Sequence, residues 1–167
     1  APGDGTVWNG ELDGGPARVR YRGAAPIQQL AARGDGSLLL GDSAGRVTSL
    51  DGADVARVVL TLPGPTHLLA LGDRGRLLVA ADGGGSLRAT DLETGEVWAP
   101  LWPESLVLGL AAAPTEGVIA AVLGDGTLHA WRPASGEERT LRGRSKLAGP
   151  VVFAPDGGSM ATCGVDS

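Results

Sequence analysis

The sequence has few of the residues on which catalysis, metal binding and disulfide bonding depend. Its 167 residues include one cysteine, Cys163, and two histidines, His67 and His129. A single cysteine excludes a disulfide framework within the chain. One cysteine and two histidines, scattered along the chain, also argue against a tetrahedral zinc site, which needs four ligands close together. We therefore expect no catalytic residues, no metal and no cofactor.

Long apolar runs and a surplus of positive charge are also missing. No apolar run approaches the roughly 20 residues that a membrane-spanning helix needs, and the N-terminal residues show no targeting segment. The formal net charge of −5 argues against a general nucleic-acid binder, which needs an excess of Lys and Arg. We expect a cytoplasmic chain without membrane or nucleic-acid partners. The 13 arginines against one lysine favour a bacterial source with a GC-rich genome.

Glycine, in contrast, is abundant and recurs at fixed distances. The 28 glycines and 11 prolines favour many short elements over long helices. A glycine followed by a small or polar residue and then Val or Leu recurs every 40 or 41 residues, at Gly5, Gly45, Gly85 and Gly126. A second series precedes short apolar runs with nearly the same period, at Gly36, Gly75, Gly117 and Gly158. Because the two series share one period, they predict a structural repeat.

Each period contains four short apolar runs separated by turns. In the second complete unit these runs are 67–71, 77–81, 87–90 and 97–101. Asp-Gly and Gly-Gly pairs between the runs are typical of β-hairpins, and no window has helical periodicity. Pro63, Pro100 and Pro103 fall in or beside the fourth run. Since proline cannot donate to a ladder, the fourth strand should be an outer edge. The sequence predicts an all-β chain of four-stranded antiparallel units.

These units resemble the WD40 repeat family of β-propellers. The clearest match is 151–157 with 159–166, which looks like the family's first strand, Pro-Asp-Gly turn and second strand. The segment 124–131 is similar to the Asp-Gly turn and the third strand that ends in the family's Trp. The resemblance covers essentially the whole chain. It implies a WD40-like β-propeller with about four blades' worth of sequence.

The chain departs from the family pattern at its signature positions. No unit carries a complete Trp-Asp dipeptide, and the Gly-His dipeptide is missing throughout. The family's turn Asp is matched by Asp4 and Asp125, and Asp166 fits as well, but Ala44 and Gly84 stand at the equivalent sites. We therefore expect apolar packing between blades, rather than the family's His–Asp network, to supply most of the stability.

The two ends of the sequence are in phase with the repeat and complement each other. We expect one propeller domain or segment, with half blades at 1–23 and 145–167 and with blades at about 24–63, 64–103 and 104–144. A lone half blade exposes a sheet edge. The halves can join within one chain as a four-bladed ring, or between two chains as a homodimer with eight blades. Alternatively, the chain is a segment of a longer propeller.

Several conspicuous motifs have structural explanations. The glycine-rich stretch 82–86 precedes a strand rather than a helix, so it is interpreted as a hairpin turn and not as a phosphate loop. Both histidines lie in predicted strands, where packing or solvation accounts for them. Packing between blades likewise accounts for Trp98 and Trp102. Alternating arginines on one predicted strand form either a charged edge or a patch for an acidic partner, at Arg18, Arg20 and Arg22.

The family resemblance implies that the chain binds proteins. WD40 propellers commonly present to partners the face with the fourth-to-first and second-to-third strand connections. We predict a non-enzymatic interaction scaffold or sensor module that presents these loops, within a larger signalling or effector protein. The candidate partner-binding residues are Asp42, His67, Asp82, Trp102, Arg144 and Lys146.

A lectin-like propeller that binds a glycan or another small ligand is the alternative. It predicts similar pockets in every unit, whereas the four tryptophans do not recur at one phase of the repeat: they are Trp8, Trp98, Trp102 and Trp131. A propeller hydrolase would need acidic residues and histidines that converge near the axis, and the chain has only two histidines.

Overall fold

The chain folds into small antiparallel sheets that follow one another in sequence order. The computed structural model describes residues 5–10, 13–101, 105–142 and 146–165, with the backbone alone for 146–148 and 165. This part contains three four-stranded sheets and two two-stranded sheets. Its helical content is one 3-10 turn, η1 (Asp73–Gly75). The predicted all-β architecture with four-stranded antiparallel units is therefore confirmed.

The strands occur in the predicted order within each sheet. The first four-stranded sheet contains β3 (Ile27–Ala32), β4 (Leu38–Asp42), β5 (Arg46–Leu50) and β6 (Ala56–Thr61). The second contains β7 (Thr66–Gly72), β8 (Leu77–Asp82), β9 (Leu87–Asp91) and β10 (Val97–Trp98). The third contains β11 (Val107–Ala112), β12 (Ile119–Leu123), β13 (Thr127–Arg132) and β14 (Glu137–Arg142). The two-stranded sheets are β1 (Thr6–Asn9) with β2 (Arg18–Arg22), and β15 (Lys146–Phe153) with β16 (Met160–Val165).

The sheets stack through their first strands and bury their faces against one another. Strand β7 contacts both β3 and β11, and β11 also contacts β15. On β8, Leu77 and Val79 pack toward the third four-stranded sheet, while Leu78 and Ala80 pack toward the first. Successive side chains of a strand point to opposite faces, so a sheet between two others needs apolar residues on both. This explains why every residue of β8 and β12 is buried.

The repeated glycine occupies the turn between the second and third strands. Gly45 and Gly85 have φ angles of +80° and +96°, in the left-handed region that favours glycine. A Cβ atom on Gly85 would also lie 2.6 Å from the carbonyl oxygen of Ser105, in the connection to the next sheet. The forty-residue period therefore marks the places where a turn meets the backbone of a neighbouring connection.

The fourth strand of the second unit is shorter than the sequence predicts. The predicted run 97–101 contributes only β10, which pairs with β9 through two residues. The chain leaves the sheet just before Pro100, which has no N–H to donate to a ladder. The fourth strands nevertheless occupy the sheet edge opposite to the first strands, as predicted from the prolines.

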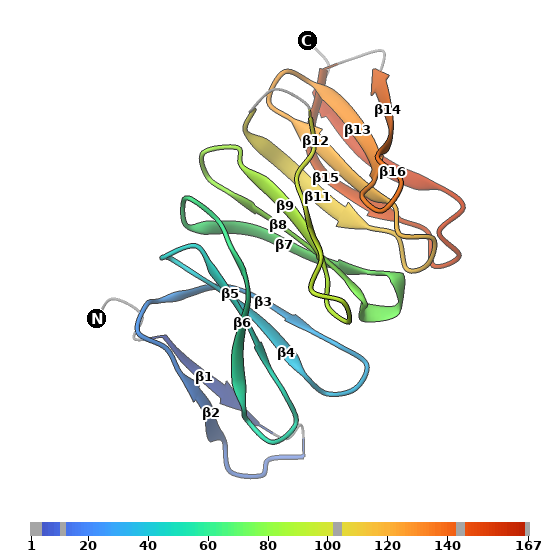
Figure 1. Cartoon of the computed structure of the whole chain (residues 1–167). Helices are drawn as coiled ribbons and strands as arrows, with labels where there is room; N and C mark the ends of the chain where they lie inside the picture. The colour runs from blue at the N-terminus through green and yellow to red at the C-terminus, as the bar shows by residue number, and fades with distance from the viewer. Residues whose placement is uncertain (1–4, 11–12, 102–104, 143–145, 166–167) are drawn as a thin grey trace.

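The two half sheets lie at opposite ends of an open arc (Figure 1). Strands β1 and β2 form one sheet and β15 and β16 another, without pairing between the two. The four-bladed ring within a single chain, one of the three arrangements compatible with the sequence, is therefore not formed. Over the described residues, no helix has the length and hydropathy needed to cross a membrane.

Candidate functional site

The turns and connections gather on two faces of the arc. The connection face carries the turns between second and third strands and the links from one sheet to the next, including 62–65 and 99–101. The hairpin face carries the turns between first and second strands and between third and fourth strands, including 73–76 and 133–136. In Figure 1 the connection face lies toward the upper left. The candidate residues Asp42, His67 and Asp82 all lie on or beside it.

Asp82 links two loops of the connection face. Its Oδ1 atom accepts hydrogen bonds from the backbone N–H groups of Gly84 at 2.9 Å and Ser86 at 2.8 Å. Its Oδ2 atom accepts one from the N–H of Gly64 at 2.9 Å, in the connection from the preceding sheet. Asp82 is 2% exposed. The buried carboxylate therefore fixes the positions of both loops through their backbone N–H groups.

Asp42 has the same position in the preceding sheet. Its Oδ1 atom accepts hydrogen bonds from the N–H groups of Ala44 and Arg46, both at 2.9 Å, and Oδ2 pairs with Nε of Arg46 at 2.9 Å. The sequence comparison placed the family's turn Asp at Ala44 and Gly84, where it is missing. The carboxylates that hold these turns belong instead to Asp42 and Asp82, two residues before Ala44 and Gly84. Each of these aspartates also stands three residues before a repeated glycine.

His67 is exposed at a β-bulge on the first strand of its sheet. Thr66 pairs with Asp82 and Leu68 with Ala81, so His67 has no cross-strand partner. Register shifts at the same position in β3 and β11 involve Gln28 and Leu108, a recurrence that sequence analysis missed. Bulges redirect side chains and are frequent beside binding sites. The first strands thus carry a row of bulges beside the connection face, with His67 and Gln28 exposed and Leu108 packed against the core.

Exposed leucines adjoin this row. Leu106 is 45% exposed and directly precedes β11, and its carbonyl oxygen accepts a hydrogen bond from Gly124 N–H at 2.8 Å. Leu101, in the same connection, is 99% exposed. Leu106 thus presents an exposed aliphatic side chain on a hydrogen-bonded backbone, which is suited to contact with another macromolecule.

Three of the six predicted partner-binding residues cannot be placed on this face as side chains. Trp102 and Arg144 lie outside the described residues, and for Lys146 the structure describes the backbone, at the start of β15. Their part in binding stays a prediction based on their sequence positions.

His129 is buried within its own sheet. Its Nδ1 atom lies 2.7 Å from Oε1 of Glu138, and its Nε2 atom lies 3.1 Å from Oγ1 of Thr127. Thr127 in turn donates from its hydroxyl to Oδ1 of Asp125 at 2.7 Å. The three-bond chain stabilises the edge of the third sheet, in agreement with the packing interpretation of this histidine.

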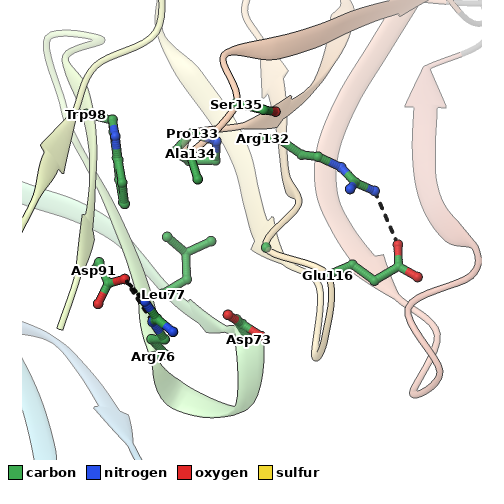
Figure 2. Close-up of a pocket in the computed structure, with 11 residues that line it drawn as sticks. Asp73, Arg76, Leu77, Asp91, Trp98, Glu116, Arg132, Pro133, Ala134 and Ser135 are labelled. Carbon is green, nitrogen blue, oxygen red and sulfur yellow. Dashed lines mark hydrogen bonds and ion pairs between the residues drawn. The ribbon is translucent and has the colours of Figure 1, made fainter. Parts of the chain in front are cut away.

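A pocket of about 460 Å³ opens on the hairpin face, between the second and third four-stranded sheets (Figure 2). The second sheet contributes Asp73, Arg76, Leu77, Asp91 and Trp98, and the third contributes Glu116, Gly117, Arg132, Pro133, Ala134 and Ser135. Its volume falls within the range of ligand pockets. Sequence analysis missed this site because its residues come from four separate turns, and they share no spacing that a single repeat would reveal.

The pocket has apolar walls. Figure 2 shows the Trp98 ring on one side and Pro133 and Ala134 on the other, with Leu77 between them. Leu77 is buried in the core between the two sheets, and the indole N–H of Trp98 donates to Oε1 of Glu96 at 3.1 Å. The walls therefore form a slot that is partly aromatic and is fixed by the packing of the two sheets.

Charged groups surround this slot. Arg76 donates from Nε to Oδ2 of Asp91 at 2.8 Å, and a second nitrogen lies 2.6 Å from the same oxygen. This contact holds the pKa of Asp91 down to about 2 and raises the pKa of Arg76. Arg132 pairs with Glu116 at 3.4 Å. Among the described residues, none donates a hydrogen bond to the Asp73 carboxylate, and no three His, Cys, Asp or Glu side chains form a metal-binding group.

Comparison with known proteins identifies the fold. No protein-family model matches the chain, and no curated protein is significantly similar to it. Among solved structures, it is similar to the β-propeller domain of Cps50 (Swd1) from Myceliophteria thermophila, with a TM-score of 0.68 and 18% identity. The match covers 85% of this chain and 49% of that one, so the chain spans about half its length. The stacked sheets and this likeness together show that the chain has the β-propeller fold.

Proposed function

We propose that this chain is a non-enzymatic protein-interaction module of the WD40-like type, and that its connection face binds a protein partner. The observation that carries the proposal is the row of bulges beside this face, which leaves His67 and Gln28 exposed, while Leu108 at the third bulge packs against the core. A rigid scaffold that presents redirected side chains lowers the ordering cost of binding. The WD40-like segments 124–131 and 151–166 support the same class of function.

The candidate residues then divide into two roles. His67 and Leu106 contact the partner, because both are exposed on or beside the connection face. Asp42 and Asp82 keep the turns in one conformation through their backbone hydrogen bonds. Trp102, Arg144 and Lys146 stay candidates from their sequence positions, and Trp and Arg are types enriched at binding hot spots.

The module belongs, in this proposal, to a larger cytoplasmic scaffold or sensor protein of bacterial origin. Two features support an extended context: the sheet edges at both ends of the arc, and the match to half of a propeller domain. Each open edge presents unpaired backbone groups to a further strand. The strand comes either from more blades of the same polypeptide or from a second copy that completes an eight-bladed ring.

Affinity capture with matched surface variants tests the proposal. The chain is used to capture proteins from a lysate of its source, and each captured protein is then purified and tested for direct binding. His67→Glu and Leu106→Asp should each weaken direct binding by roughly tenfold or more, as expected for central contacts. Ala53→Glu is the control, because Ala53 is exposed in the β5–β6 turn on the hairpin face.

Two outcomes would count against the proposal. Equal loss of binding for Ala53→Glu and His67→Glu would remove the assignment to the connection face. Saturable binding to a glycan array, with no captured protein, would favour the lectin-like function instead.

A further inference from the structure

We propose that the pocket between the second and third four-stranded sheets binds an arginine side chain from a partner protein. The pocket lies on the hairpin face, opposite to the surface assigned to partner binding above, so this is a second and separate site. Three properties of the pocket carry the inference: its charge, its apolar slot, and a lining that the equivalent cavity of the next pair of sheets does not share.

The charges around the pocket favour a cationic occupant. Three carboxylates line the pocket, Asp73, Asp91 and Glu116, together with two guanidinium groups, Arg76 and Arg132. Beside the pocket, Glu93 lies near Arg76, and Glu137 lies near Arg132 and closer still to Arg139. Arg76 pairs with Asp91 and also lies 3.4 Å from Glu93. Arg132 is shared between Glu116 at 3.4 Å and Glu137 at 3.9 Å. Both cations are already matched, so an added anion would meet excess negative charge, whereas an added cation would complement it.

Asp73 is the acceptor that this arrangement leaves open. It takes no hydrogen bond from the residues described here, and it lies at the base of the pocket below Leu77 in Figure 2. Its backbone is held in place, because its N–H donates to the carbonyl oxygen of Ala113 at 2.9 Å. A guanidinium that enters the pocket would find in Asp73 a carboxylate with which it can form paired hydrogen bonds.

The apolar slot fits the rest of an arginine side chain. The Trp98 ring lies opposite Pro133 and Ala134 (Figure 2), so a flat group that enters between them can stack on the indole. Guanidinium groups are planar, weakly hydrated and stack on indole rings, and the methylene stem can pack on Leu77. A lysine ammonium gains the charge but not the stacking, so we expect arginine to bind more tightly.

A cavity of about 320 Å³ lies at the equivalent place between the third sheet and β16, and it is lined by Val118, Arg132 and Arg139 where this pocket has Leu77, Asp91 and Trp98. Trp98 pairs with Ala89, and the equivalent pairs in the neighbouring sheets place Arg57 opposite Ser49 and Arg139 opposite Ala130. An arginine at the position of Trp98 removes the aromatic wall and adds positive charge. The cavity at the next interface therefore has arginines in place of the aromatic wall and of the Asp91 carboxylate, so we expect it not to accept an arginine.

Titration with short peptides tests the inference. The probe is acetyl-Gly-Gly-Arg-Gly-Gly-amide, and the control peptide carries citrulline, which has nearly the same shape but no charge. Binding is followed by the NMR signal of the Trp98 indole N–H. The arginine peptide should shift this signal saturably, and the citrulline peptide should bind roughly tenfold more weakly or worse. Added salt should weaken the arginine complex.

Two variants separate the pocket from general surface charge. Asp73→Asn should weaken arginine binding roughly fivefold or more, and asparagine tolerates the left-handed backbone at this position, where φ is +46°. Asp35→Asn is the matched control, because Asp35 lies in the equivalent turn of the preceding sheet, outside the pocket. Trp98→Leu should also reduce arginine binding while keeping an apolar side chain; because this variant lacks the indole signal, its binding is followed by the backbone amide signal of Leu77.

The proposal is overturned if the citrulline peptide binds as well as the arginine peptide, or if Asp73→Asn has the same affinity as the unmodified chain. Preference for acetyl-Gly-Gly-Glu-Gly-Gly-amide would overturn it too, by assigning an anion to Arg76 and Arg132. His67→Glu should leave peptide binding unchanged, so failure here is distinguishable from failure of the connection-face proposal.

Discussion

Arg20 on β2 donates a hydrogen bond from Nε to Oδ1 of Asp54 across 2.6 Å, which joins the first two-stranded sheet to the β5–β6 turn. A second nitrogen of Arg20 donates to the carbonyl oxygen of Asp51 at 2.8 Å, and the Arg20 side chain is only 8% exposed. The sequence offered two interpretations of the arginines on this strand, a charged edge or a patch for an acidic partner. Neither describes Arg20, which connects neighbouring sheets.

Replacement of Arg20 should destabilise the fold. Arg20→Met keeps the aliphatic stem but leaves Asp54 and the carbonyl of Asp51 without this donor, so we expect a loss of about 2 kcal/mol in the free energy of unfolding. Arg18→Met is the control, because Arg18 is 65% exposed and lies 3.9 Å from Asp54. Urea denaturation measures the free energy of unfolding of both variants. Equal losses would show that the Arg20–Asp54 contact adds no more stability than the exposed Arg18 does.

Asp82 should stabilise two loops at once. Asp82→Ala removes three backbone hydrogen bonds, including the one from Gly64 in the neighbouring connection, and leaves the half-buried Gly64 and Ser86 N–H groups without this acceptor. We expect a loss of about 2–3 kcal/mol. Hydrogen exchange should accelerate at Gly64 as well as at Ser86, which a purely local effect would not produce. Asp156→Ala is the control, since exposed Asp156 accepts from one N–H, that of Gly158.

The fold was predictable because its main determinants repeat within the sequence. The glycine period located the turns, and the wholly apolar runs of β8 and β12 marked strands that are buried on both faces. The pocket and the Arg20–Asp54 contact were not predictable, because each joins residues from different units whose approach depends on how the sheets stack. The roles of Asp42 and Asp82 were within reach, since each stands three residues before a repeated glycine.

The repeated glycine should be intolerant of any side chain, while its neighbour in the same turn should accept one. In Gly85→Ala the new Cβ atom meets the Ser105 carbonyl oxygen at 2.6 Å, and φ stays at +96°, so we expect a loss of at least about 2 kcal/mol. Gly83→Ala should change stability by less than about 0.5 kcal/mol, because no atom lies within 4 Å of its Cβ position. Thermal unfolding compares the two, and similar melting temperatures would contradict this account of the period.

The contact between Arg76 and Asp91 should make stability depend on pH in the acidic range. In the folded chain the pKa of Asp91 is about 2, below the ordinary value of 3.8. The ionised carboxylate therefore stabilises the fold above pH 4, and this contribution is lost as the pH falls from 4 to 2. Asp91→Asn should therefore cost about 1–2 kcal/mol at pH 7, allowing for solvent screening of half-exposed Arg76, and almost nothing at pH 2. Glu93→Gln is the control, because exposed Glu93 lies farther from Arg76, at 3.4 Å.

Urea denaturation at pH 7, 4, 3 and 2 measures the difference in the free energy of unfolding between Asp91→Asn and the unmodified chain. A difference that stays constant over this range would show that Asp91 acts through its hydrogen bonds to Glu93 and Thr94 rather than through its charge.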